Sequence, residues 1–205
     1  MRCWPIGFLL VFGMFAFPLE SGSRQPKQPR SVLPCSAIKD EPEKFERPSP
    51  PGCSDVKFAD GGLIVVRYSR PKLRNPDNGR IREVFGSTVR WGEIWRAGAN
   101  EATSFTTNAN LIIGNRPVPA GSYTIYLIPE HRKPWTLILN KTTGQWGMPY
   151  PGSSSDLARI DMDAALLRDG MDQLTVEFGA SGNDSTTLTF AWENWKAAVA
   201  IVEAR

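Results

Sequence analysis

Ser122-Tyr-Thr-Ile-Tyr-Leu-Ile128 and Trp135-Thr-Leu-Ile-Leu139 decide the fold class of this chain. Both runs are short, apolar and rich in β-branched and aromatic residues, a composition that favours strands over helices. The connection between them begins at Pro129 and ends at Pro134, and two prolines so close together interrupt regular structure. We therefore predict two strands joined by a short irregular segment.

The same pattern continues on both sides of this pair. Val56-Lys-Phe58 and Leu63–Ser69 flank Asp60-Gly-Gly62, which is a hairpin turn signal. Further strand-like runs are Thr103–Thr107, Leu111–Ile113, Gln173–Phe178, Thr186–Trp192 and Ala198–Val202.

One segment, Leu157–Leu167, is ambiguous between strand and helix. Within it, Asp161–Arg168 is the only serious helix candidate and would make one or two turns. About eight or nine short strands separated by turn signals predict an all-β fold. We expect a single antiparallel β-sandwich or jelly-roll-like domain over residues 54–205, with at most one short helix.

Two segments of different composition precede this domain. Residues 3–19 carry no charge, follow Met1-Arg2 and lead to the small residues Ser21-Gly-Ser23. This order predicts a secretory signal peptide over residues 1–23, and hence export to the periplasm or the extracellular space. The alternative is an uncleaved membrane anchor, for which the apolar run is slightly short.

Residues 24–53 are rich in proline, lysine, glutamate and serine, and we interpret them as a linker. Two cysteines, Cys35 and Cys53, remain after removal of the signal peptide. An even pair in an exported chain predicts a disulfide bond between them.

Several classes of function are not expected from the composition. The net charge is only +3, and no basic stripe with interleaved aromatic residues occurs, so we expect no nucleic-acid partner. His131 is the single histidine and lies in a charged turn, which argues against a zinc or copper site and against a serine–histidine–acid triad. EF-hand and phosphate-binding glycine motifs do not occur, so we expect no metal and no cofactor.

The stretch Trp91–Thr107 combines tryptophans, carboxylates, Arg96 and Asn100 in one run. Charged groups among buried aromatic rings must be paired or hydrogen-bonded, so the run is either a polar network within the core or a binding site. Arg70 would clamp an anionic group or pair with Glu101. The predicted ligand-binding residues are Arg70, Trp91, Trp95, Arg96, Asn100, Glu101 and Trp146.

Glu101 and Glu93 are the candidate catalytic residues if the protein is an enzyme. Two carboxylates beside aromatic platforms are the groups that a glycosidase uses. Two glutamates that flank Arg96 are, however, more often part of an ion-pair network.

Four motifs occur in a characteristic order: Tyr68-Ser-Arg-Pro71, Trp95-Arg-Ala-Gly-Ala-Asn-Glu-Ala-Thr103, Pro119-Ala-Gly-Ser-Tyr123 and Gln145-Trp-Gly147. Together they resemble the domain-of-unknown-function family numbered 2911 (DUF 2911) of exported bacterial proteins, over about residues 56–202. The resemblance implies a signal peptide and a compact β-rich domain, and it implies no activity. The chain departs from the family pattern in its long loop over residues 70–82 and in its cysteine-containing leader.

We expect a non-catalytic module that binds a small-molecule or glycan ligand or has a structural role. The alternative is a carboxylate-dependent hydrolase that acts on an extracellular glycan, with Glu101 or Glu93 as acid or base. A third hypothesis is an assembly module whose edge strands pair with a partner chain.

Overall fold

The computed structural model describes Met1 and residues 31–37, 48–75, 78–180 and 182–204. Apart from Met1, the predicted signal peptide lies outside these residues, as does most of the predicted linker. Within the described part of the chain, no helix is long and apolar enough to cross a membrane.

The all-β prediction is confirmed. The strands are β1 (Pro51–Lys57), β2 (Leu63–Ser69), β3 (Ser104–Thr107), β4 (Leu111–Ile113), β5 (Arg116–Val118), β6 (Gly121–Ile128), β7 (Trp135–Asn140), β8 (Asp156–Phe178) and β9 (Ser185–Glu203). Two short 3-10 turns, η1 (Cys35–Ala37) and η2 (Ser153–Ser155), are the only helical elements among the described residues.

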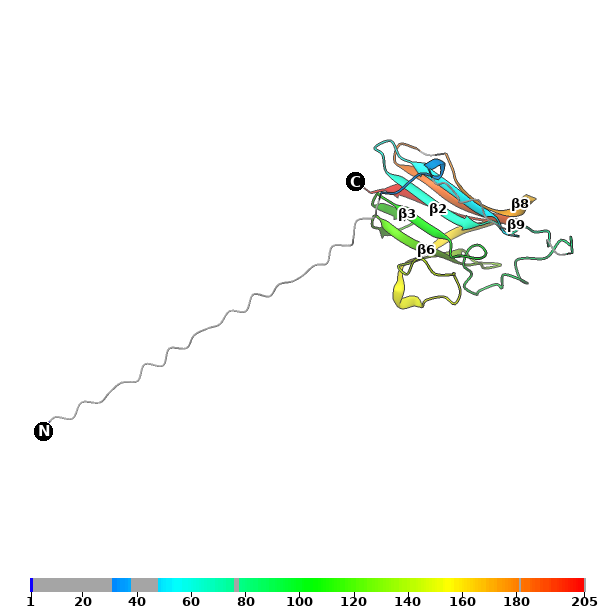
Figure 1. The fold of residues 1–205 in the computed structure, drawn as a ribbon, viewed down its shortest axis with the longest axis horizontal. Coiled ribbons are helices and arrows are strands. Elements are labelled where there is room, and N and C mark those ends of the chain that lie inside the picture. The colour runs from blue at the N-terminus through cyan, green and yellow to red at the C-terminus, as the bar shows by residue number, and fades with distance from the viewer. Residues whose placement is uncertain (2–30, 38–47, 76–77, 181, 205) are drawn as a thin grey trace.

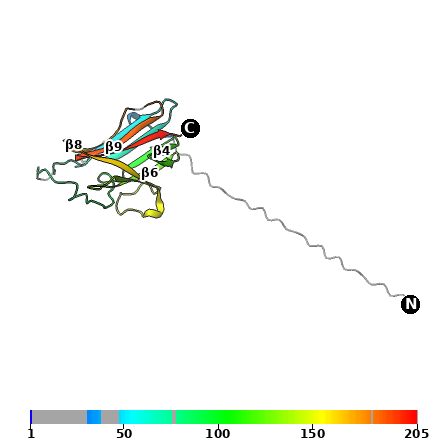
Figure 2. The ribbon, with the colours of Figure 1, turned by 180° about the vertical axis from the view of Figure 1, so that it is seen from behind.

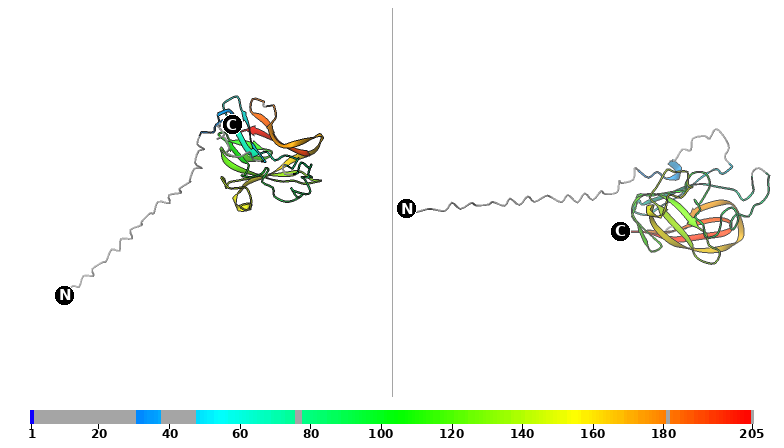
Figure 3. Two further views of the ribbon diagram at one scale, coloured as in Figure 1. Left: turned by 45° about the vertical axis from the view of Figure 1, so that its right-hand side comes forward. Right: turned by 90° about the horizontal axis from the view of Figure 1, so that it is seen from below.

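All nine strands belong to one antiparallel sheet, which is not closed, in the order β1-β2-β3-β6-β7-β8-β9-β4-β5. Figure 1 shows β2, β3 and β6 side by side, and the view from behind in Figure 2 shows β8, β9 and β4. The side views in Figure 3 show how strongly the sheet curves. Because of this curvature, one continuous sheet encloses a single core.

Strand β8 connects the two halves of the sheet. Its first part pairs with β7, as in Trp135↔Met162. Its second part pairs with β9, as in Asp163↔Ala198, and the register shifts between Leu166 and Met171. The change of partner from β7 to β9 falls between Met162 and Asp163, and the irregular register lies farther along the β8–β9 pairing.

The helix candidate Asp161–Arg168 is thus wrong, because this segment lies inside β8. Ile160 and Met162 are buried while Asp161 and Asp163 are exposed, which is the period-two pattern of a strand. The alanines and leucines that follow are good helix formers, but pairing with neighbouring strands overrides that preference.

The core lies on the concave face and receives side chains from both halves of the sheet. Fully buried members include Phe105 from β3, Leu137 from β7 and Ile201 from β9. Burying a side chain of this size stabilises the fold by roughly 1.5–3 kcal/mol. The core therefore supplies the main driving force that holds the two halves together.

The predicted disulfide bond between Cys35 and Cys53 is present, with a Cα–Cα distance of 5.8 Å. Cys53 lies within β1 and Cys35 begins the η1 turn. The bond therefore ties the leader to the edge strand of the sheet.

Candidate functional site

Trp91 and Trp95 lie in an aromatic cluster against the core. The ring centroid of Trp91 is 5.3 Å from that of Trp195, and Trp95 stacks on Trp192 at 5.9 Å. The indole N–H of Trp95 donates a hydrogen bond to the Gly98 carbonyl at 3.1 Å. Both tryptophans are half-buried, and their contacts are those of packing residues.

The full cluster contains seven aromatic residues with centroid distances from 5.0 to 6.4 Å: Phe85, Trp91, Trp95, His131, Trp135, Trp192 and Trp195. Each such pair adds about 0.5–1.5 kcal/mol beyond the burial of its surface. The cluster therefore stabilises this end of the domain.

The two candidate catalytic carboxylates contact different parts of the molecule. Glu93 is exposed and forms an ion pair with the exposed Arg90 at 3.4 Å. The Glu101 carboxylate accepts a hydrogen bond from the Ser69 hydroxyl at 3.5 Å. The two carboxylates thus contact different residues, Arg90 and Ser69.

Arg70 joins β2 to β8. Its side chain lies over Gly52, where a Cβ atom would come within 2.7 Å of the Arg70 Cδ. Its Nε donates to the Leu174 carbonyl at 3.5 Å, and its own carbonyl accepts from the Gln173 side chain at 2.9 Å. These contacts hold the start of the following loop against β8.

Residues 96–102 pack against residues 145–147, which places Arg96 beside the loop that carries Trp146. The Asn100 side chain on the same segment donates to the Ser49 carbonyl at 3.3 Å. The Ala102 N–H donates to the Gln145 carbonyl at 3.3 Å. Gly147 has φ 105°, and a Cβ there would lie 2.8 Å from the Arg96 Cδ. Only glycine combines this backbone conformation with so close an approach.

We call this region the Trp146 surface and define it as Arg96, Asn100, Glu101, Ala102, Gln145, Trp146 and Met148. Trp146 is 59% exposed and Met148 is 44% exposed. Within the described residues, Trp146 is the only aromatic among the exposed large hydrophobic side chains. Its exposure therefore distinguishes it from the tryptophans of the aromatic cluster.

A polar network under the Trp146 loop fixes the loop on the outer face of β6. The Gln145 side-chain nitrogen lies 3.2 Å from both the Thr124 hydroxyl and the Tyr126 hydroxyl. Tyr126 is fully buried, and this burial raises the pKa of its hydroxyl above the ordinary value of 10.0. The Gln145 Oε1 is also buried and has no hydrogen-bond partner among the described residues.

The far end of the same loop is fixed by Asp156. Its carboxylate accepts hydrogen bonds from the Tyr150 hydroxyl at 2.5 Å, from Asn140 at 2.8 Å and from Arg159 at 2.9 Å. The Tyr150 ring also packs edge-on against Tyr126 at 5.1 Å. The loop that carries Trp146 is thus held at both ends.

Three residues that support the Trp146 loop were not among the predicted site residues: Tyr126, Tyr150 and Asp156. The position of Tyr126 was open to prediction from the sequence. It lies between Ile125 and Leu127 in a predicted strand, and neighbouring residues of a strand face opposite sides of the sheet. The partners of Asp156, by contrast, meet only through the fold.

Neither a metal site nor a second site for a small ligand is indicated elsewhere in the described residues. In the described part of the chain, no group of three His, Cys, Asp or Glu residues is placed to hold a metal ion. An open depression of about 370 Å³ is lined by Asp60, Gly61, Gly62, Asn108, Ala109, Asn110, Glu203 and Ala204. Its Asn108 side chain accepts the Leu63 N–H at 2.6 Å, which is a structural contact at the start of β2.

The fold and the loop define an all-β domain with one open antiparallel sheet and an exposed tryptophan on its outer face. The chain belongs to the family described as protein of unknown function (DUF2911), whose sequence profile matches residues 49–201. This confirms the resemblance inferred from the motifs. No curated protein and no solved structure matches the chain significantly.

Proposed function

We propose that this domain is an exported, non-catalytic module that binds a glycan at the Trp146 surface. The observation that carries the proposal is the 59% exposure of Trp146 on a loop fixed by hydrogen bonds at both ends. A large exposed apolar ring costs solubility and adds little stability, so its retention on a rigid loop favours a role in recognition.

The surroundings of Trp146 suit a sugar better than a purely apolar ligand. An indole face offers a flat apolar platform for the C–H face of a sugar ring, and polar atoms beside it can bind the hydroxyl groups. The neighbouring segment 96–102 carries two polar groups, the Arg96 guanidinium, which donates to the Asn100 carbonyl, and the Glu101 carboxylate, which accepts from Ser69. Met148, which is 44% exposed, extends the apolar platform.

The Glu93 and Glu101 carboxylates contact different parts of the molecule, and this supports binding without catalysis. A glycosidase needs two carboxyl groups at about 5–10 Å on opposite sides of one bond. Glu93 pairs with Arg90 in the exposed turn around Trp91, whereas Glu101 contacts Ser69 at the end of β2. The hydrolase alternative therefore has less support.

The test is a binding titration of the full chain with chitohexaose and with cellohexaose. We expect saturable binding of at least one of them and a loss of at least about tenfold in affinity for Trp146→Ala, since truncating a buried aromatic contact typically costs 2 kcal/mol or more. Ile112→Ala is the matched control, because Ile112 is 42% exposed on β4.

Reducing ends released from the same oligosaccharides are measured in parallel. Binding that needs Trp146, without release of products, supports the proposal. Product release that is abolished in Glu101→Gln would establish the hydrolase alternative. Equal affinities for Trp146→Ala and the native chain would exclude the Trp146 surface as the glycan site.

A further inference from the structure

A second exposed feature lies at one end of the sheet and does not depend on the proposed glycan site. Residues 70–82 contain five basic side chains and one acidic side chain, Asp77, whereas the net charge of the entire chain is only +3. We call the described residues 72–75 and 78–82 the basic hairpin. Figure 1 shows it at the right-hand tip of the fold, away from the C-terminus.

The basic hairpin has a defined backbone structure. Arg74 pairs with Ile81 in an antiparallel bridge, and the Asn75 N–H donates to the Arg80 carbonyl at 2.8 Å. At its base, the Leu73 N–H donates to the Asp172 carbonyl of β8 at 2.5 Å. The hairpin is therefore an ordered projection from the sheet.

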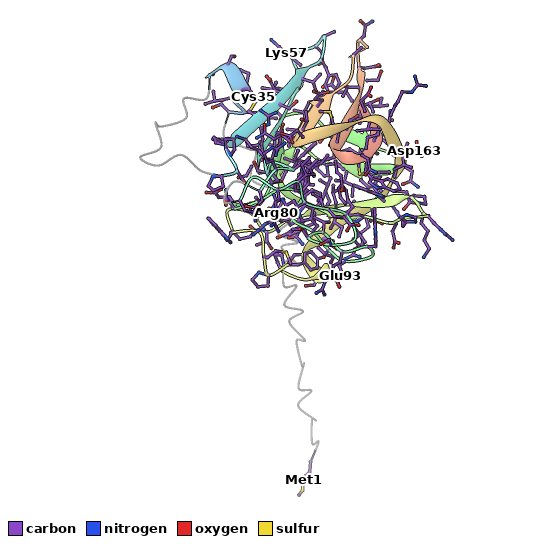
Figure 4. The ribbon with its side chains drawn as sticks, turned by 90° about the vertical axis from the view of Figure 1, so that its right-hand side faces the viewer. Met1, Cys35, Lys57, Arg80, Glu93 and Asp163 are labelled. Carbon is purple, nitrogen blue, oxygen red and sulfur yellow. A yellow bond between two sulfur atoms is a disulfide. The ribbon has the colours of Figure 1, made fainter. Side chains whose placement is uncertain are left out.

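Arg82 attaches the hairpin and is not part of its exposed face. Its guanidinium donates to the Lys72 carbonyl at 2.7 Å and lies 5.9 Å from the centroid of Trp192. The remaining cations, Lys72, Arg74 and Arg80, are exposed. Figure 4 looks onto this end of the molecule and shows Arg80 near its centre.

Ile81 lies between Arg80 and Arg82 and is 67% exposed, the highest exposure of any large hydrophobic residue described after Met1. Strands β2 and β6 run in the same direction, because each pairs antiparallel with β3. The β6–β7 connection, which carries Arg132 and Lys133, therefore lies at the end of the sheet where β2 ends. Acidic side chains also lie near the hairpin: Glu83 and Asp172 are exposed, and the Glu193 carboxylate accepts the Val84 and Phe85 N–H groups.

We infer that the basic hairpin docks on an anionic membrane surface, with the cations at the lipid phosphates and Ile81 entering the interface. Basic side chains near an anionic bilayer each strengthen binding by about fivefold at physiological salt. A soluble polyanion would use the same cations but gives no reason to expose an aliphatic side chain between them. The aliphatic residue therefore favours a lipid surface over a polyanion.

The test is sedimentation of the full chain with vesicles of equal parts phosphatidylglycerol and phosphatidylcholine, and with phosphatidylcholine alone. The neutral vesicles measure any contribution of the apolar residues 3–19. We expect the double variant Arg74→Gln/Arg80→Gln to weaken binding to the anionic vesicles by about 25-fold, and Ile81→Ser by at least about fivefold.

The control removes two charges at the opposite end of the sheet, in the double variant Lys57→Gln/Lys141→Gln. Lys57 pairs with Leu63, the first residue of β2. Lys141 directly follows β7, whose last residue, Asn140, pairs with Thr124 in the first half of β6. This control should weaken binding less than threefold. Equal losses in the two double variants would overturn the inference, because net charge alone would then explain binding.

Heparin binding provides the second arm. If heparin competes with the anionic vesicles and Ile81→Ser binds both as well as the native chain does, the hairpin is a polyanion site and the inference is wrong. Thermal unfolding of each variant verifies that the fold is intact. Because the Trp146→Ala variant keeps the hairpin, it should bind vesicles normally, which separates this test from that of the glycan site.

Discussion

Trp95 and Trp146 have opposite surroundings, and truncation of each should therefore have a different effect. Trp95 stacks on Trp192 at 5.9 Å and donates a hydrogen bond to Gly98, so Trp95→Ala should destabilise the fold by about 3 kcal/mol. In a chain of this size, that corresponds to a decrease of roughly 6–12 °C in melting temperature. Trp146→Ala should change the free energy of unfolding by less than about 0.5 kcal/mol, because its ring is mostly in water.

Differential scanning calorimetry of both variants checks this prediction. A large loss of stability in Trp146→Ala would show that the exposed ring has a structural role. The proposed binding function would then lose its main support.

The tyrosine hydroxyls of the outer face give a second prediction, on pH dependence. Burial raises the pKa of Tyr126 and of Tyr150 above 10.0, so the folded state favours their neutral forms. The unfolded chain ionises these groups first as the pH rises. Their contribution to stability is therefore fully present below about pH 10 and is lost as the pH rises through the folded values.

Urea unfolding at a series of pH values from about 8 to 11.5 measures this dependence. Tyr126→Phe should be less stable than the native chain at pH 8, because Gln145 loses a hydrogen-bond partner. It should also lose less stability between pH 9.5 and 11 than the native chain does. Identical slopes for the two proteins would contradict the assignment.

At the scale of elements, Tyr68 bridges β2 and β8 where the sheet is not closed. Its hydroxyl accepts the Val176 N–H at 3.0 Å. Tyr68→Phe leaves this buried N–H without a partner and should cost about 1–3 kcal/mol. Tyr123→Phe is the matched comparison, because its hydroxyl donates to the carbonyl of the exposed Pro119, which water can satisfy.

Chemical denaturation of the two variants gives the comparison directly. Tyr68→Phe should be the less stable of the two. The reverse order would mean that the contact between β2 and β8 contributes little.

The strands were predictable where a short run of β-branched and aromatic residues is bounded by turn signals. Leu63–Ser69 and Leu111–Ile113 were predicted with the bounds that the structure has. The predicted strands Thr186–Trp192 and Ala198–Val202 are parts of one strand, β9, which continues through Glu193 at φ 54°. Local patterns could not reveal this, because the continuation depends on the contacts of the Glu193 carboxylate with the Val84 and Phe85 N–H groups.

The candidate site was predictable to the level of a region. The residue types of Arg96, Asn100 and Glu101 suggested polar contacts, and the glycines and prolines around Trp146 suggested an exposed loop. That residues 96–102 pack against this loop depends on Gly147 and on the Ala102 to Gln145 hydrogen bond, which only the fold brings together. The packing of Trp91 against Trp195 and of Trp95 against Trp192 could not be predicted, because only the fold brings these rings together.

For the whole molecule, the Cys35–Cys53 bond is the one disulfide cross-link between the leader and the sheet among the described residues. In the chain-entropy estimate, a loop of this length stabilises the folded state by about 3 kcal/mol. Cys35→Ser/Cys53→Ser should therefore melt several degrees below the oxidised native chain. Equal melting temperatures would mean that the bond restrains only the leader and leaves the stability of the sheet unchanged.

We propose above that the Trp146 surface is where this domain meets a glycan. Hydrogen–deuterium exchange of the full chain, free and saturated with whichever of chitohexaose and cellohexaose it binds, tests this claim most directly. We predict slower exchange in residues 96–102 and 142–152, and unchanged exchange in the basic hairpin and in the depression lined by Asp60 and Glu203. Protection confined to the aromatic cluster or to that depression, with residues 142–152 unaffected, would contradict the account.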